Sequence, residues 1–238
     1  MNTILILSAA LLPPLILCLY ILMKDPQPEP KSQLIKAILY GMAICIPAVF
    51  LEMGIEAALF GTDGMPSSLC GSTAQAFIVA ALPEESLKLL ALWLVLRHNP
   101  YFDEHFDGIV YAVCVGLGFA AIENICYVFS QEDWMSVAIF RALLAVPGHY
   151  AFAILMGYYY SMYHFVDHTP KVAACVLLIP VLAHGAYDAL AMSGAVNPYI
   201  GSFAFFVLIY FCVKMQKVAR QKVLALIEQD DSITTNMT

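Results

Sequence analysis

Seven apolar stretches dominate this sequence and limit the folds that it can adopt. They cover residues 3–23, 34–59, 70–96, 108–129, 137–166, 171–192 and 199–213. A helix that crosses the hydrocarbon core of a bilayer needs about 20 apolar residues. The composition agrees, because 61% of the residues are hydrophobic and only 12% are charged, against about 25% charged in soluble domains. We therefore expect an all-α fold: a polytopic membrane helical bundle of about seven transmembrane helices, with residues 1–238 as a single integral membrane domain.

The basic residues indicate how this bundle is oriented. Lysine and arginine collect in the cytoplasmic loops of membrane proteins. If the N-terminus is outside, nine of the eleven basic residues fall on the cytoplasmic side, namely Lys24, Lys31, Lys36, Arg97, Lys171, Lys214, Lys217, Arg220 and Lys222. We expect an N-out/C-in, multi-pass protein of the bacterial cytoplasmic membrane. Its cytoplasmic tail is 214–238, and we expect residues 214–229 of that tail to form a helix on the membrane surface.

One short stretch breaks the apolar pattern of the third span. Glu84, Glu85 and Lys88 lie inside it, where each charge facing lipid would cost roughly 2.5 to 3.5 kcal/mol. The two acids precede the lysine by four and three residues, so one face of a helix can pair them. Pro83 removes a backbone hydrogen bond and crowds the carbonyl of Val79, which loosens the helix just before the acids. Ionisable residues inside a membrane mark functional sites, so we interpret this stretch as a site.

Polar side chains on other spans lie at a similar depth. They are Glu123 on the fourth span, His149 on the fifth, and His184 with Asp188 on the sixth. At 1.5 Å per residue, these residues and Glu84 lie roughly 6 to 21 Å below the expected outer surface. Consecutive helices joined by short loops are usually neighbours. The sequence therefore predicts one shared cavity that opens outward.

Small residues mark one face of the fourth span. They are Gly116, Gly118, Ala120 and Ala121. Small side chains let helix backbones approach one another closely inside a membrane. We therefore expect tight helix packing along this face.

Three short motifs occur in order on three spans. Residues 84–88 fit EExxK, residues 119–123 fit FxxxE, and residues 184–188 fit HxxxD. Together they resemble the PrsW family of intramembrane proteases, within the superfamily of the type II CAAX prenyl endopeptidases, with 71–193 as the protease-like core. Where the prenyl endopeptidases have a histidine at the end of the second motif, this chain has Glu123, which favours the PrsW branch.

The resemblance implies a glutamate-type endopeptidase that makes the first, site-1, cut near the outer membrane face. The implied partner is a single-span membrane protein such as an anti-sigma factor, besides membrane lipid. No basic patch could hold nucleic acid, so we expect none to bind. The sequence leaves the oligomeric state open.

The polar residues suit peptide hydrolysis, which needs a base for water and donors for the oxyanion. We expect Glu84 to activate water, Glu85 to pair with Lys88 or to fix a histidine, and His149 and His184 to hold the water or the oxyanion. Adjacent helical residues point about 100° apart, so only one glutamate can aim at the water, and the sequence does not say which. The candidate catalytic residues are Glu84, Glu85, Glu123, His149, His184 and Asp188, with Lys88 and Phe119 in structural or charge-pairing roles.

Two alternatives use the same side chains. Glu85, Glu123, His149 and His184 form a plausible zinc set with an open position for water. The sequence has no H-E-x-x-H motif, so we expect no cofactor and keep zinc as the alternative. The second alternative is a proton or cation transporter, against which the lack of internal repeats argues.

The remaining polar residues have simpler explanations. Three of them lie near the outer interface, where solvation would account for them: Glu52, Glu56 and Arg141. Four histidines are expected in loops: His98, His105, His164 and His168.

Overall fold

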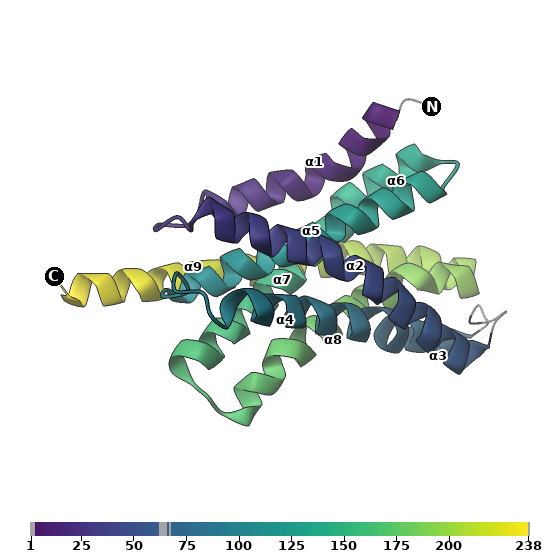
Figure 1. Cartoon of the computed structure of the whole chain (residues 1–238). Coiled ribbons are helices and arrows are strands. Elements are labelled where there is room, and N and C mark those ends of the chain that lie inside the picture. The colour runs from purple at the N-terminus through teal and green to yellow at the C-terminus, as the bar shows by residue number, and fades with distance from the viewer. Residues whose placement is uncertain (1–2, 62–65, 67, 238) are drawn as a thin grey trace.

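The computed structural model confirms the all-α fold. It describes residues 3–61, 66 and 68–237, and all regular structure in these residues is helical. The elements are α1 (Thr3–Leu22), α2 (Lys31–Phe60), α3 (Leu69–Ala74), η1 (Gln75–Ala81), α4 (Leu82–Leu96), α5 (His105–Ser130), α6 (Trp134–Phe140), η2 (Arg141–Ala145), α7 (Val146–Ser161), η3 (Met162–Val166), α8 (Pro170–Val196) and α9 (Pro198–Met237). The segments named η are π-helical and continue their neighbours without a break. These described residues therefore form seven helical rods, with the two ends of the chain at opposite ends of the bundle (Figure 1).

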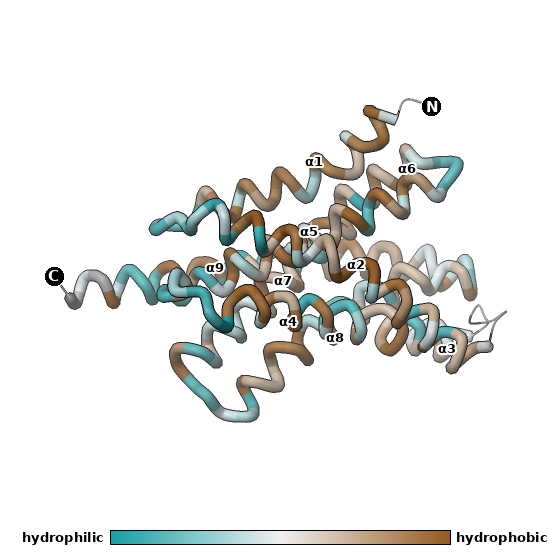
Figure 2. The backbone as a smooth tube through the Cα atoms, viewed as in Figure 1, coloured by the Kyte–Doolittle hydropathy of each residue, from teal (hydrophilic) through white to brown (hydrophobic). Residues whose placement is uncertain are grey.

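Six of the seven rods are long and apolar enough to cross a membrane. The remaining rod, 69–96, is the one that carries Glu84, Glu85 and Lys88. Hydrophobic residues run along the rods, and hydrophilic ones gather in the connections between them (Figure 2). Large apolar side chains such as Phe50 and Phe206 are exposed, as expected of a surface that faces lipid. The chain is a multi-pass membrane protein.

Helix α5 is the centre of the bundle. Its apolar window is 72% buried, a larger share than in the other candidate spans, and it packs against α1, α2, α7 and α9. A Cβ atom on Gly118 would lie 2.4 Å from the carbonyl oxygen of Ile38 on α2, and one on Gly116 would lie 2.8 Å from Cβ of Ala153 on α7. The expected close helix packing is confirmed, but it occurs on two sides of α5, because Gly116 faces α7 and Gly118 faces α2, and not along one face.

Two π-helical turns lie directly before prolines. Segment η1 precedes Pro83, and η2 precedes Pro147. At the end of η1 the Leu82 N–H donates to the carbonyl of Phe77, five residues back. A proline cannot donate to the helix and crowds the turn before it, which a wider turn relieves. The expected loosening before Glu84 is therefore present, and the same device recurs before His149.

The C-terminal tail differs from the prediction. Helix α9 continues through residue 213 to Met237, so residues 214–229 extend the span and do not form a separate surface helix. Its apolar face, including Ala219 and Leu226, is buried in the main hydrophobic core. The carboxylate of Asp230 accepts backbone N–H bonds from His105 and Phe106 at the start of α5, at 3.0 and 2.9 Å.

Two of the four histidines predicted in loops, His105 and His164, lie in helical segments, and His164 is an exposed residue of η3. His105 is the first residue of α5, is buried, and has Nδ1 2.6 Å from Oδ1 of Asp230. Contacts between residues 125 positions apart in the sequence cannot be read from a local pattern.

Candidate active site

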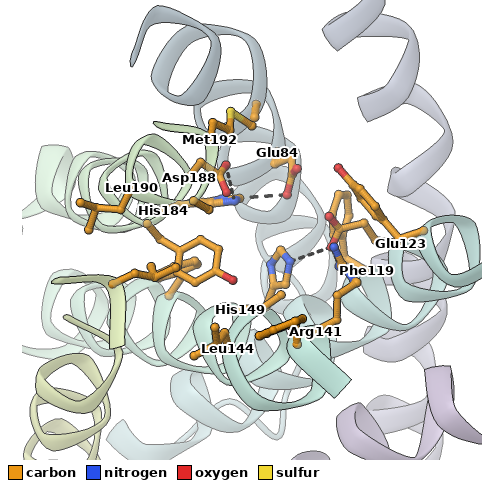
Figure 3. Close-up of a pocket in the computed structure, with 18 of the residues that line it drawn as sticks. Glu84, Phe119, Glu123, Arg141, Leu144, His149, His184, Asp188, Leu190 and Met192 are labelled. Atoms are coloured by element: carbon orange, nitrogen blue, oxygen red, sulfur yellow. Dashed lines mark hydrogen bonds and ion pairs between the residues drawn. The ribbon is translucent and has the colours of Figure 1, made fainter. Parts of the chain in front are cut away.

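The three motifs meet in one place. The residues come from four rods: Glu84, Glu85 and Lys88 from α4, Phe119 and Glu123 from α5, His149 from α7, and His184 and Asp188 from α8. All of them except Glu85 and Lys88 line a single cavity of about 590 Å³ (Figure 3). The structure thus brings the candidate residues together around one cavity, as the sequence predicts.

The ammonium group of Lys88 lies at the centre of this cluster. Its Nζ is 2.9 Å from Oε2 of Glu84, 2.8 Å from Oε1 of Glu85 and 3.2 Å from Nδ1 of His149. It also lies 4.3 Å from the centroid of the Phe119 ring, within the range of a cation–π contact. One buried cation therefore neutralises both glutamates, and Phe119 supports it.

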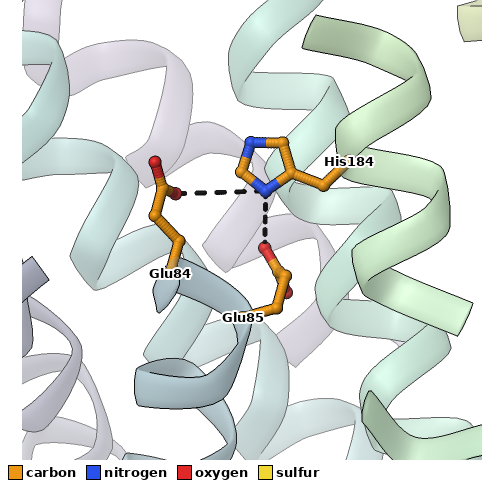
Figure 4. Close-up of side chains that lie close together, drawn as sticks. All are labelled: Glu84, Glu85 and His184. Atoms are coloured by element: carbon orange, nitrogen blue, oxygen red, sulfur yellow. Dashed lines mark hydrogen bonds and ion pairs between the residues drawn. The ribbon is translucent and has the colours of Figure 1, made fainter. Parts of the chain in front are cut away.

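Three acidic side chains surround His184. Its Nδ1 lies 2.9 Å from Oε1 of Glu85 and 4.0 Å from Oε2 of Glu84 (Figure 4). Its Nε2 lies 3.2 Å from Oδ2 of Asp188, one helical turn further along α8. The ring stacks on Phe152, with centroids 4.9 Å apart and planes at 19°. The acidic partners hold both ring nitrogens of His184, and the Phe152 ring covers one face of the imidazole.

His149 belongs to a second polar chain. Its Nε2 lies 2.7 Å from Oε2 of Glu123, and Nη2 of Arg141 lies 2.7 Å from the same oxygen. The Nε of Arg141 donates to Oδ1 of Asn124 at 2.5 Å, and Nδ2 of Asn124 donates to the carbonyl of Ala10 at 3.0 Å. This chain joins α7, α5, η2 and α1 along one wall of the cavity.

Arg141 corrects one prediction. Its guanidinium is mostly buried and paired with Glu123, whereas the sequence suggested a solvated residue at the interface. The helix begins at Trp134, so Arg141 lies seven residues, or about 10 Å, inside it. Arg141 and Lys88 are the two basic residues that do not fall on the expected cytoplasmic side. This unusual position of Arg141 could have indicated a buried acidic partner.

The sequence analysis did not assign two further polar or aromatic cavity residues, Glu52 and Phe152, to the site. Glu52 on α2 lines the cavity, although the sequence placed it at the interface. Phe152 lines it as well and supports His184. The role of Phe152 depends on ring stacking between α7 and α8, and no spacing in the sequence reveals such a contact. Glu56 instead accepts a hydrogen bond from Nε2 of Gln75 at 3.2 Å.

The two adjacent glutamates differ in what they face. Glu84 lines the cavity, and only its Oε2 is hydrogen-bonded, so within the described part of the chain Oε1 has no partner. Glu85 is 0% exposed, does not line the cavity, and holds Lys88 and His184. Of the two, Glu84 faces the cavity and Glu85 contacts Lys88 and His184.

Three side chains of the site have donor atoms close enough together to share a metal ion. Glu84, Glu85 and His184 each offer one ligand atom, and these atoms lie within 4.8 Å of one another, a donor set that zinc can use. However, Lys88 lies 2.9 and 2.8 Å from oxygens of the same two glutamates, so a metal would have to displace a buried ammonium group. As arranged, the residues do not fit a metal.

The zinc set expected from the sequence is also not assembled. Glu85 and His184 belong to the group of three, but Glu123 and His149 pair with each other at 2.7 Å. Lys88 lies between the two pairs, because its Nζ contacts both Glu85 and His149.

Most of the remaining cavity wall is apolar. It includes Leu144, Leu190 and Met192 (Figure 3) and also Phe140 and Phe205. An apolar cavity with a few convergent polar groups is the usual form of a binding site. The arrangement suits an apolar polypeptide segment presented to a carboxylate.

Comparisons with known proteins show the family of the chain. A family model described as PrsW family intramembrane metalloprotease matches residues 29–215. Protease PrsW of Clostridioides difficile (strain 630) is 37% identical over 190 residues, covering 77% of each chain. Protease PrsW of Geobacillus kaustophilus (strain HTA426) is 34% identical over 79% of this chain and 80% of its own. No solved structure matches the chain. The chain therefore belongs to the PrsW family of intramembrane proteases.

Proposed function

We propose that this protein is a glutamate-type endopeptidase in which Glu84 activates the water that cuts a membrane-tethered peptide. The observation that supports this role is the position of Glu84, the one member of the adjacent glutamate pair that faces the cavity. Its Oε2 is held by Lys88, while Oε1 has no hydrogen bond among the described residues. A carboxylate in this position can receive a proton from a water bound in the cavity.

The proposed reaction uses the surrounding groups in separate roles. Glu84 takes a proton from water as the water oxygen attacks the peptide carbonyl carbon, and it then gives this proton to the leaving amine. His184, 4.0 Å from Glu84, is positioned to orient the same water. Arg141 lines the cavity and uses Nε and Nη2 for Asn124 and Glu123, so we assign its Nη1 as a donor to the oxyanion.

The surroundings of Glu84 supply the rest of the site. Glu85 and Asp188 orient His184, Lys88 balances the charge of the two glutamates, and Glu123 orients His149. The proposed catalytic and supporting residues are the candidates named from the sequence, with Arg141 and Phe152 added.

We assign the substrate as a single-span membrane protein, such as an anti-sigma factor, cut near the outer face of the bacterial cytoplasmic membrane. Support comes from the cavity residues on α5, which lie in its C-terminal half, from Phe119 onward. This half is distant from the loops that hold most of the basic residues. By the positive-inside rule those loops are cytoplasmic, so the N-out/C-in orientation places the cavity toward the outside.

The relatives named Protease PrsW favour a peptidase over the transporter alternative. The zinc alternative keeps some support, because Glu84, Glu85 and His184 could hold a metal if Lys88 moved away. In that case the metal would supply an activated water.

The test is cleavage of a single-span peptide by the purified full-length protein in vesicles, with the products sized. We expect one cut near the outer end of the span, at the same rate with and without a chelator. Cleavage that a chelator abolishes and zinc restores would favour the metal alternative. An uncut peptide together with a proton flux through the vesicles would favour transport.

A further inference from the structure

Five acidic side chains gather at the end of the bundle far from the cavity. We call Asp25, Glu29, Asp103, Glu104 and Asp107 the acidic cluster. Single oxygens of Asp25, Glu104 and Asp107 lie within 4.8 Å of one another, and so do single oxygens of Glu29, Asp103 and Asp107. The cluster joins the α1–α2 linker to the start of α5, and Asp107 belongs to both groups of three.

Glu123 lies sixteen residues further along α5 than Asp107, or about 24 Å. The acidic cluster is therefore separate from the candidate active site.

Local hydrogen bonds hold the carboxylates of Asp25, Glu29, Glu104 and Asp107. Oδ2 of Asp107 accepts the backbone N–H groups of Asp103 and Glu104, at 3.1 and 2.8 Å, in a capping box. Oδ1 of Asp25 accepts the N–H of Gln27 at 3.1 Å. Tyr111 donates to Glu29. The side chains are thus ordered by contacts that leave other carboxylate oxygens unused.

Two of these other oxygens are buried without a donor. Asp107 is 0% exposed and Asp25 is 8% exposed, yet among the described residues no N–H group and no hydroxyl donates to Oδ1 of Asp107 or to Oδ2 of Asp25; Asp107 meets only the carboxyl group of Glu29 there. In the described ranges, no lysine or arginine forms an ion pair with any member of the acidic cluster. Buried polar atoms without partners are rare in folded proteins, and buried charges are costly unless they are compensated.

A bound cation would offset the crowding of these carboxylates, because it favours the charged form of each of them.

We propose that the acidic cluster binds a hard divalent cation, magnesium or calcium, between the α1–α2 linker and the N-terminus of α5. All the ligands that it offers are carboxylate oxygens, which these two ions prefer over softer metals. The ion would tie the linker to the helix that carries Phe119 and Glu123. It stabilises the fold and takes no part in peptide cleavage.

The test uses the full-length protein in detergent, stripped with a chelator and dialysed. The unfolding temperature is measured against Mg²⁺ or Ca²⁺ concentration, with KCl of equal ionic strength as the control. Binding is measured directly with Mn²⁺ by electron paramagnetic resonance. We expect a saturable rise in unfolding temperature with at least one divalent ion, and no comparable rise with KCl.

The variants separate the site from general charge effects. Asp25→Asn keeps the acceptor for Gln27 but removes one ligand charge, so the divalent ion should bind at least ten-fold more weakly. In chelator, this variant should be at least as stable as the wild type, because its carboxylates repel one another less.

Asp103→Asn, at an exposed position, is a second variant in case Asp25→Asn folds poorly. Asp231→Asn removes the same charge at an exposed position on α9 and should bind like the wild type.

Two results would overturn the proposal. One is an equal response to divalent ions in the wild type and in both ligand variants. The other is an unfolding temperature that rises when the pH is lowered but does not rise when Mg²⁺ or Ca²⁺ is added. Protons, and not a divalent cation, would then neutralise the acidic cluster.

Discussion

Oε1 of Glu85 lies 2.9 Å from Nδ1 of His184, which joins α4 to α8 across 99 residues of sequence. The same oxygen lies 2.8 Å from Nζ of Lys88. Glu85 therefore supports both the histidine and the central cation, while the neighbouring Glu84 remains turned toward the cavity. This division of roles leads to different predictions for the two glutamates.

Glu85→Gln should lower stability strongly. The amide keeps the size of the side chain but removes the charge that balances Lys88, and breaking a buried ion pair costs about 3 to 5 kcal/mol. We expect a clear drop in unfolding temperature in detergent. Glu132→Gln makes the same chemical change at an exposed position and should leave the unfolding temperature unchanged. Equal stability of the two variants would contradict a supporting role for Glu85.

Phe152→Leu should reduce catalysis through His184. Aromatic pairs contribute about 0.5 to 1.5 kcal/mol beyond their buried area, so losing the stacking on His184 should lower kcat roughly two- to ten-fold. The pH profile of kcat should shift as well, since the environment of the imidazole changes. Phe205→Leu alters another cavity residue that makes ring contacts with Phe140 and Phe206. Phe205→Leu should leave the pH profile of kcat unchanged. If both variants shift this profile equally, Phe152 has no specific effect on His184.

Arg141 and Glu123 should be energetically coupled. Arg141→Met leaves Glu123 with His149, and Glu123→Gln leaves Arg141 with Asn124. Each single change should be destabilising, and the double variant should lose less than the sum. We expect an interaction energy of about 1 to 3 kcal/mol from a double-mutant cycle of unfolding free energies. Strict additivity would mean that the ion pair contributes nothing to stability.

Gly118→Ala should separate α2 from α5. The added Cβ would lie 2.4 Å from the carbonyl oxygen of Ile38, so one backbone must move, and overpacking of this kind costs about 1 to 3 kcal/mol. Gly54→Ala on α2 is the matched control, because nothing lies within 4 Å of its added Cβ. Measured unfolding temperatures should fall for the first variant only. A stable Gly118→Ala protein would show that the contact can relax.

Much of the fold and the site could be predicted from the sequence. Lipid excludes unpaired backbone groups, so long apolar runs must become helices. Buried charges must find partners, so Glu84, Glu85 and Lys88 had to face other polar residues. These two constraints act on short segments, which is why the seven rods and the convergence of the three motifs were predicted correctly.

What could not be predicted depends on helix rotation and on contacts between distant residues. The choice between Glu84 and Glu85 required the orientation of α4 relative to the cavity. The partner of Arg141 required the true start of its helix, at Trp134. The packing of Ala219 and Leu226 against the bundle required the position of α9, which basic and apolar residues in alternation do not reveal.

The central claim is that Glu84 activates the attacking water, and single-turnover kinetics of Glu84→Gln test it most directly. Each enzyme would be mixed, in molar excess over the substrate, with a tethered single-span peptide in vesicles. The enzymes compared are the wild type, Glu84→Gln and the control Glu132→Gln. Binding of the peptide would be measured separately. We predict that Glu84→Gln binds the peptide normally but cuts it at least about 100-fold more slowly, since general bases contribute 10²- to 10⁴-fold. Cleavage by Glu84→Gln at the wild-type rate would contradict the account.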